Sequence, residues 1–273
     1  MELILLSLGL GVVVVFWIGV TAWVTMVATL AYGRFYYDKA ECDGTARYYW
    51  PAARSTFVGA LLRRLLRHEL VEAPSSLPPG PVLFACRPHG IFVVSAWLTF
   101  LLGAYERPPR PRVLLAIHSV IFAIPGLREF ALMLGCIDVS RASIEAALAR
   151  GYSVAVLPGG VKEMGPSVVP LPDEPGIVKL AQDYDVPLVP VWFGGEVALF
   201  WVWHGEPRWV AAARALCITR WRIPFPLFWC PRFWRVPRLR TIMGDPVAAG
   251  GANGNTPLHV SLKENEAALR QRE

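Results

Sequence analysis

The chain begins with an unbroken apolar stretch. No charged residue occurs from Leu3 to Gly33, where Val, Leu, Ile, Trp and Phe dominate. A helix needs about 20 apolar residues to cross the ~30 Å hydrocarbon core of a bilayer. Residues 1–35 are therefore predicted to form an amino-terminal transmembrane segment, either one long span or a re-entrant hairpin turning near Gly19. A cleaved signal peptide is disfavoured, because its apolar region covers only about 7–15 residues.

Basic and aromatic residues follow this stretch directly. They are frequent from Arg34 to Trp50, a composition typical of the cytoplasmic end of a span. Leucines then alternate with arginines from Leu61 to Leu70, which predicts a short basic amphipathic helix on the membrane surface. We expect residues 36–80 to form this basic, aromatic interfacial helix and a linker.

From residue 81 onward, short apolar runs alternate with helical patterns. Strands are predicted at 82–86, 113–117, 153–157 and 187–193, with helices at 140–150 and 177–184. This alternation is typical of βαβ units, so we predict an α/β domain over residues 81–273 around a mainly parallel sheet. Ligands in such sheets bind beyond the carboxyl ends of the strands. The segments after Cys86, Leu157 and Phe193 are therefore the places to look for chemistry.

The last third of the chain has a weaker pattern. Trp, Pro and Arg are interleaved from Trp201 to Leu239, where we expect no clean helix. This segment either dips into the headgroup region or packs on the α/β core. A glycine-rich loop at Gly250–Asn255 then precedes a polar terminal helix.

Composition narrows the class of protein. Apolar residues make up 54% of the chain and charged residues 18%, which excludes a disordered chain. The net charge of +6 favours anionic surfaces or phosphorylated substrates. Nucleic acid is not expected, because no Lys/Arg stripe is present. The five cysteines are scattered without a C-x-x-C pair, which argues against a disulfide framework and a zinc site. A membrane-associated enzyme fits these features.

Three strand ends have residues suited to chemistry. Arg87-Pro88-His89-Gly90 follows the first strand, and histidine is the side chain best suited to general base work near neutral pH. Gly159 and Gly160 follow the third strand, ahead of Lys162 and Glu163, and paired glycines let backbone N–H groups approach an oxyanion. The fourth strand runs into Gly194-Gly195-Glu196, which adds a second carboxylate.

In this order the motifs resemble the diacylglycerol acyltransferase 2 family, which includes monoacylglycerol and wax-ester acyltransferases. Residues 87–90 are similar to its His-Pro-His-Gly motif. Residues Pro125–Glu129 are similar to its Pro-x-x-Arg-Glu helix, with Arg128 and Glu129 at the last two positions. Residues 159–163 are similar to its Gly-Gly-x-x-Glu motif, and the resemblance covers about residues 80–250.

Two positions depart from the family pattern. Arg87 replaces the first histidine of the motif, and one glycine is inserted before Glu196. The broader glycerolipid acyltransferases carry His-x-x-x-x-Asp, but position 94 is Val94 here. A carboxylate that orients His89 must therefore come from elsewhere, and Glu163 is our first choice.

The resemblance implies transfer of a fatty acyl group from acyl-CoA to a neutral lipid hydroxyl, first of all diacylglycerol. His89 would be the general base, with Glu163 orienting it and Gly159 and Gly160 binding the oxyanion. Pro88 and Gly90 would frame the histidine, and Arg87 and Lys162 would attract the phosphates of CoA. Glu196, Arg128 and Glu129 are further candidates.

The resemblance also implies the setting of the reaction. Acyl-CoA would be a co-substrate, with no cofactor, metal or acyl-enzyme, and the bilayer and the neutral lipid would be partners. The domain would face the cytosol from the endoplasmic reticulum membrane. A location on lipid droplets and assembly into a homo-oligomer are further possibilities. The alternatives are a monoacylglycerol or fatty-alcohol acyltransferase, then a lysophospholipid acyltransferase, then a non-catalytic lipid-binding protein on the same scaffold.

Overall fold

The structure is a computed structural model that divides the chain into two units, Met1–Lys39 and Ala40–Glu273. It describes residues 2–54, 57–74, 77–88, 90, 92–103, 105, 113–160, 176–199, 201–202, 207–217, 228–229, 237–250 and 258–272.

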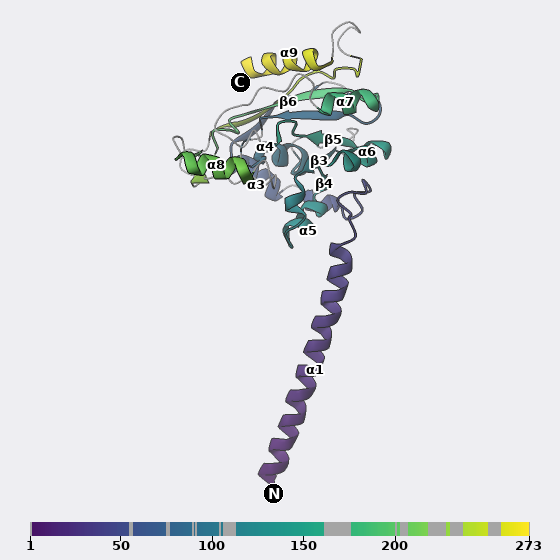
Figure 1. The fold of residues 1–273 in the computed structure, drawn as a ribbon, viewed down its shortest axis with the longest axis vertical. Helices are drawn as coiled ribbons and strands as arrows, with labels where there is room; N and C mark the ends of the chain where they lie inside the picture. The colour runs from purple at the N-terminus through teal and green to yellow at the C-terminus, as the bar shows by residue number, and fades with distance from the viewer. Residues whose placement is uncertain are drawn as a thin grey trace. The chain divides into compact units, whose positions relative to one another are not determined.

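The first unit is one helix, α1 (Glu2–Tyr36), drawn in purple in Figure 1. Its part from Val15 to Tyr36 is long and apolar enough to cross a membrane, judged by length and composition. The predicted span is therefore a single helix rather than a hairpin. Thr21, Thr25 and Thr29 donate their hydroxyls to carbonyls one turn back, at 2.8–2.9 Å. These bonds satisfy the threonine side chains without water, as a lipid environment requires.

The second unit is built on a seven-stranded sheet in the order β1-β9-β6-β2-β5-β3-β4. Five neighbouring strands run parallel, while β9 is antiparallel to β6 and parallel to β1. The predicted α/β class with a mainly parallel sheet is therefore confirmed. The strands are β1 (His68–Glu72), β2 (Leu83–Arg87), β3 (Val113–Ile117), β4 (Cys136–Asp138), β5 (Ser153–Val156), β6 (Leu188–Gly194) and β9 (Leu239–Met243).

Helices connect and cover these strands (Figure 1). They are α2 (Pro51–Arg54), α3 (Phe57–Leu65), α4 (Val94–Ala96), α5 (Leu127–Met133), α6 (Arg141–Ala149), α7 (Gly176–Asp183), α8 (Arg208–Leu216) and α9 (Leu258–Gln271). A π-helical turn, η1 (Trp97–Leu101), continues α4, and a 3₁₀ turn, η2 (Ser119–Ile121), follows β3. A small two-stranded sheet pairs β7 (Trp201–Val202) with β8 (Phe228–Trp229).

Alternation along β2 shows how the two faces of the sheet are covered. Leu83 and Ala85 join a buried cluster with residues of α6 and α7. Phe84 points to the other face, where its ring centroid lies 5.2 Å from that of Phe100 in η1 and 5.7 Å from that of Tyr105. Both faces are apolar because parallel strands are buried on both sides.

Two local expectations were wrong. The basic amphipathic helix ends at Leu65, and Leu70 belongs to β1, whose pairing with β9 supplies backbone hydrogen bonds that a helix could not make there. A helix, α8, also forms inside 201–239, where its four alanines have high helix propensity. The tryptophan- and proline-rich run from Trp221 to Leu227 and the loop at 251–255 lie outside the described residues.

A buried arginine ties α2 to the sheet. Arg54, at 1% exposure, donates from Nε to the Leu134 carbonyl and from Nη2 to the Val113 carbonyl, both at 2.9 Å. Its guanidinium lies 4.6 Å from the centroid of the Tyr49 ring. A side chain at Gly135 would come within 2.7 Å of the same Nη2, so glycine leaves room for it.

We expect Arg54→Ala to lower the stability of the second unit by about 2 kcal/mol or more, because two buried carbonyls lose their donor. Arg141→Ala is the control, since Arg141 is half-exposed and its ion pairs with Glu145 and Asp183 contribute little. Thermal unfolding of the detergent-solubilised chain measures both. Equal melting temperatures for the two variants would contradict this role for Arg54.

Candidate functional site

The strands that precede three of the predicted motifs end at one carboxyl edge of the sheet. Ala85 of β2 pairs with Val156 of β5, and Arg87 of β2 pairs with Trp192 of β6, so these strands end close together. The segments that leave this edge are Pro88–Val93 after β2, His118 after β3, Leu157–Gly160 after β5 and Gly195–Glu196 after β6. A parallel sheet thus brings four segments distant in sequence to one place.

Of the predicted catalytic residues, His89 and Glu163 lie outside the described residues, as does Lys162. The residues on either side of His89 are described. Gly90 has φ +57°, a backbone conformation that favours glycine. A Cβ at this position would lie 3.2 Å from the Glu196 carbonyl oxygen and 3.6 Å from its Cγ. Glu196 therefore packs directly against the residue that follows His89.

Glu196 is a buried carboxylate with three donors. Its Oε1 accepts the N–H of Val94 at 2.8 Å, and its Oε2 accepts both the N–H of Ser95 at 3.0 Å and the Ser95 hydroxyl. Only 1% of the residue is exposed. Its carboxylate therefore lies at the first turn of α4, which begins four residues after Gly90.

The extra glycine explains how Glu196 reaches this position. Gly195 has φ +77°, and a Cβ there would lie 2.4 Å from the Arg238 carbonyl oxygen. No other residue fits this contact without a backbone shift. The chain then turns sharply, with the Ala198 N–H donating to the Gly195 carbonyl at 3.1 Å. The insertion thus directs Glu196 back toward α4.

Burial raises the pKa of Glu196 from 4.5 to about 7, although its hydrogen bonds with Ser95 and Val94 lower it. A second titratable group, partly buried, lies further along the sheet. His68 Nε2 lies 2.9 Å from Thr241 Oγ1, and burial followed by the charge of Arg63 lowers the pKa of His68 to about 4. The two groups therefore respond to pH in opposite directions.

Arg87 is buried away from this carboxylate. It follows Leu83 and Ala85 in the alternation of β2, and its Nη1 lies 2.5 Å from Glu266 Oε1 of α9. The ion pair joins the sheet to the terminal helix. The structure thus gives Arg87 an internal partner, whereas the sequence suggested the phosphates of CoA.

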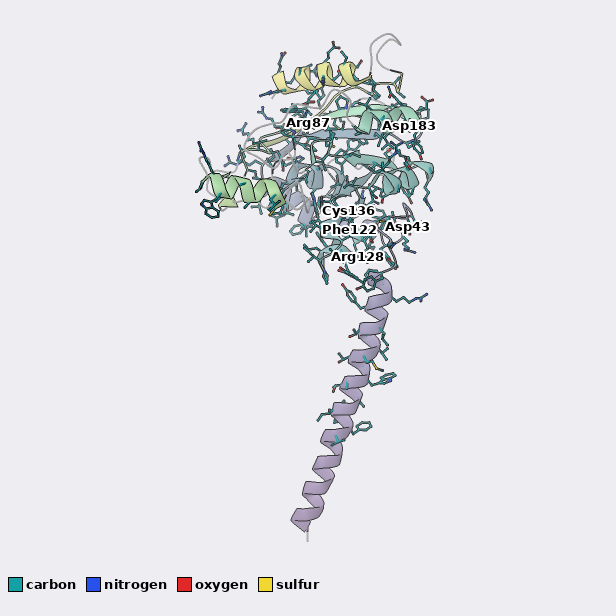
Figure 2. The ribbon with its side chains drawn as sticks, viewed as in Figure 1. Asp43, Arg87, Phe122, Arg128, Cys136 and Asp183 are labelled. Atoms are coloured by element: carbon teal, nitrogen blue, oxygen red, sulfur yellow. The ribbon has the colours of Figure 1, made fainter. Side chains whose placement is uncertain are left out.

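Arg128 and Glu129 also have local partners. Arg128, fully buried, donates from Nη2 to Glu41 Oε2 at 2.8 Å. Glu129 accepts the Gly126 N–H and so caps α5. Figure 2 shows Arg128 well separated from Arg87, which lies close to α9. The structure therefore does not bring Arg87 and Arg128 together at one site.

The paired glycines form the turn after β5. Gly160 has φ +51°, and its N–H donates to the Leu157 carbonyl at 3.1 Å. In the described part of the chain, the Gly159 N–H has no such backbone bond. Gly160 and Leu157 also line a cavity.

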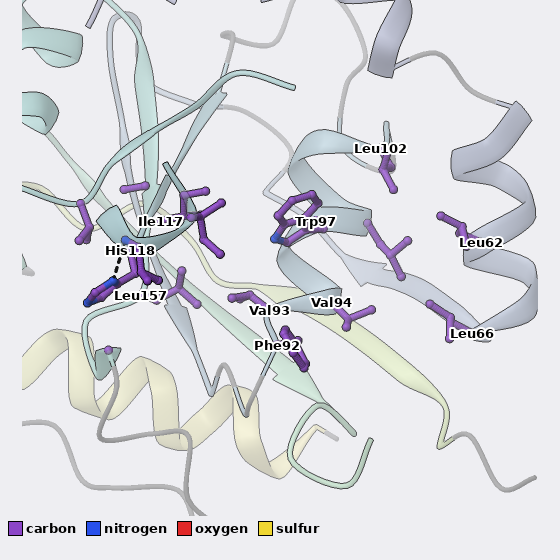
Figure 3. A pocket seen from close by; sticks show the side chains of 16 residues that line it. Leu62, Leu66, Phe92, Val93, Val94, Trp97, Leu102, Ile117, His118 and Leu157 are labelled. Atoms are coloured by element: carbon purple, nitrogen blue, oxygen red, sulfur yellow. Dashed lines mark hydrogen bonds between the residues drawn. The ribbon is translucent and has the colours of Figure 1, made fainter. Parts of the chain in front are cut away.

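This cavity has a volume of about 470 Å³, within the usual size range for small-molecule sites. Figure 3 shows Leu62 of α3 and Leu66 just after it at one end, His118 and Leu157 at the other, and Trp97 between them. The remaining lining is almost entirely apolar, with Phe92, Val93, Val94, Leu98, Leu102, Ala116, Ile117, Val120, Ile121, Val139 and Gly160. Its shape and lining suit a hydrocarbon chain.

His118 is a cavity residue that the sequence analysis missed. Its Nδ1 accepts the Val120 N–H at 3.2 Å, which caps η2 and leaves Nε2 as the second ring nitrogen. The signal was present, because His118 follows the predicted strand 113–117 directly, as His89 follows the first strand. The described residues contain no group of three or more His, Cys, Asp or Glu placed to hold a metal ion.

Comparisons with known proteins point to one family. A family model described as diacylglycerol acyltransferase matches residues 16–249. Diacylglycerol O-acyltransferase 2 of Xenopus tropicalis is 31% identical over 139 residues, covering 47% of this chain and 38% of that protein. Acyl-CoA wax alcohol acyltransferase 2 of Homo sapiens is 29% identical over 144 residues, covering 48% and 43%. The matched regions thus span about two-fifths of these relatives.

A likeness to a solved structure is weaker. The crystal structure of the 1-acyl-sn-glycerophosphate (LPA) acyltransferase PlsC from Thermotoga maritima is 17% identical, with a TM-score of 0.49. The likeness covers 78% of this chain and 76% of that one.

The buried carboxyl predicts a pH-dependent stability. Because the pKa of Glu196 is raised on folding, its contribution to stability is complete below pH 4.5 and is lost as the pH rises to about 7. Glu196→Gln should remove this dependence. The melting temperature of the variant minus that of the wild type should therefore increase from pH 5 to pH 8. Taking the difference between the two proteins cancels the opposite effect of His68. A difference that stays constant with pH would contradict the raised pKa.

Proposed function

Because the chain belongs to the diacylglycerol acyltransferase family, we propose that it transfers a fatty acyl group from acyl-CoA to a neutral lipid hydroxyl. Diacylglycerol is the proposed acceptor and triacylglycerol the product. The family match over residues 16–249 is the observation that carries this proposal. The apolar cavity at the carboxyl edge of the sheet supports it, since both substrates have long hydrocarbon chains.

In the proposed reaction His89 is the general base. The acceptor oxygen attacks the thioester carbonyl as the imidazole takes the hydroxyl proton, and the N–H of Gly159 stabilises the oxyanion. The C–S bond then breaks, and the CoA thiolate takes the proton from the imidazolium. No acyl-enzyme is needed, because a thioester is already activated. Acyl-CoA is the co-substrate, and the proposal includes no metal or further cofactor.

Carboxylate and cation roles follow the motifs. Glu163 is proposed to orient the imidazole and stabilise its charged form, as the carboxylate does in a catalytic triad. Lys162 is proposed to attract the CoA phosphates. The Arg87–Glu266 ion pair supports a structural role for the first position of the motif. The replacement of its histidine therefore does not favour a non-catalytic lipid-binding protein.

The bilayer is the proposed source of the acceptor. On α3, Phe57, Val58 and Leu65 are 79%, 60% and 62% exposed, while Leu62 and Leu66 beside them line the cavity. An apolar face at a cavity wall suits entry of a lipid from the membrane. We propose that the enzyme resides in the endoplasmic reticulum membrane, with residues 40–273 in the cytosol, or on lipid droplets.

An acyl-transfer assay tests this function. Membranes from cells that lack neutral-lipid synthesis and express the chain are given labelled oleoyl-CoA with diacylglycerol, monoacylglycerol, a fatty alcohol or lysophosphatidate. We expect triacylglycerol, and we expect His89→Ala to lower its rate by about 10²–10⁴-fold, the usual contribution of a general base. Glu163→Gln should cost less, because the base remains.

Other products would change the assignment. Wax ester or diacylglycerol as the main product would favour a fatty-alcohol or monoacylglycerol acceptor, and product from lysophosphatidate alone would favour a phospholipid enzyme. No product from correctly inserted protein would favour a binding role. Full activity of His89→Ala would refute the general base.

The cavity predicts acyl-chain selectivity. Ile121 lines it, and Ile121→Trp should shorten the preferred acyl chain, because the larger side chain fills part of the cavity. Ile124→Trp is the matched control, since Ile124 is 44% exposed and lies outside the lining. Rates with acyl-CoA donors of 8 to 18 carbons measure the effect. We expect the ratio of the rates with short and long donors to change roughly tenfold, because long chains lose contacts in the filled cavity. An identical chain-length profile for both variants would show that the acyl chain does not bind in this cavity.

A further inference from the structure

The first turn of α4 depends on a side chain from another strand. Its N-cap residue, Val93, has no side chain that can accept a hydrogen bond. Ser95 is fully buried, so water cannot satisfy its amide. Glu196, at the end of β6, supplies the acceptor for it through Oε2. Its Oε1 also accepts the Val94 N–H, which is shared with the Phe92 carbonyl at 2.8 Å.

Glu196 also packs against the backbone just before this turn. Its carbonyl oxygen and Cγ lie 3.2 Å and 3.6 Å from where a Cβ on Gly90 would be. Glu196 thus contacts both Gly90 and Val94. Phe92 and Val93 within that segment line the cavity.

A buried carboxylate is a costly way to hold a turn. Burial of a carboxylate is unfavourable unless donors offset it, and a neutral cap such as serine or asparagine at position 93 would serve the helix alone. Buried carboxyl groups of this kind gather at functional sites. Its place beside the cavity and next to the His89 segment therefore favours a role in the reaction.

We propose that Glu196 is the positioning carboxylate of the site, which fixes residues 88–94 and through them the imidazole of His89. It takes the place of the aspartate absent at position 94, because its carboxylate bonds the backbone N–H of that very residue. The inference rests on the proposed function and adds a residue to it. It is separate from the role of Glu163, which acts on the imidazole itself.

Steady-state kinetics of the full chain in detergent micelles test this role. Glu196→Gln replaces one acceptor oxygen by an amide N–H₂ group, which only donates. One of the two backbone N–H groups then loses its acceptor on this side chain. We expect kcat to fall by up to about 100-fold, as displaced catalytic groups do, with the KM for oleoyl-CoA nearly unchanged. Ser95→Ala should show a smaller loss of the same kind. Glu264→Gln, at an exposed position on α9, is the matched control and should behave as wild type.

The double variant His89→Ala/Glu196→Gln separates positioning from general destabilisation. If Glu196 acts through His89, the double variant has the same residual rate as His89→Ala alone. Additive losses, or a raised KM with kcat retained, would overturn the proposal.

Hydrogen exchange measured by mass spectrometry gives a readout independent of activity. Glu196→Gln should speed exchange of the peptide covering residues 88–101, while Glu264→Gln should not. Unchanged exchange there would overturn the proposal even if the wild type acylates another acceptor. Absence of acyl transfer in the wild type, with faster exchange in Glu196→Gln, would refute the proposed reaction and leave the contact intact.

Discussion

Five parallel strands that end at one edge are the constraint on which the site depends. Parallel strands must be joined by crossovers, so every strand in the group delivers its following loop to the same side of the sheet. The loops after β2, β3, β5 and β6 are therefore neighbours, although they are spread over about 110 residues of sequence. The same arrangement buries both faces of the sheet and leaves its edge as the place where polar groups can meet a ligand.

Glu196 shows how a buried charged group is stabilised at that edge. A carboxylate inside the protein needs donors, and the two amides and one hydroxyl at the start of α4 provide them. The buried Ser95 amide in turn needs an acceptor, since Val93 cannot cap the helix. The carboxylate and the donors at the start of α4 thus satisfy each other's hydrogen bonds. Two glycines with positive φ, Gly90 and Gly195, make the close approach possible.

Buried arginines hold the outer segments to this sheet. Arg54 bonds the carbonyls of Val113 and Leu134, Arg87 pairs with Glu266 of α9, and Arg128 pairs with Glu41. Glutamates neutralise Arg87 and Arg128, and Arg54 is buried against backbone carbonyls, so these three side chains do not contribute a basic surface.

The sequence by itself determined the apolar span, four of the five parallel strands and the motifs at their ends, whereas the short strand β4 was not predicted. These follow from local patterns, because hydrophobic period and helix caps depend on nearby residues. The strand Val113–Ile117 and the helix after Ser140 were found within a residue of their bounds. His118 follows one of these strands directly but was not among the predicted residues.

Only the tertiary structure decided which polar groups are partners. The ion pair of Arg87 joins residues 179 apart, and the bond from Val94 to Glu196 spans 102. No local period encodes such pairs, since they depend on which strands become neighbours and which face each side chain takes. The inserted glycine made the position of Glu196 hardest to foresee from sequence. In three dimensions Gly195 permits the turn that brings this carboxylate to α4, because a Cβ there would collide with the Arg238 backbone.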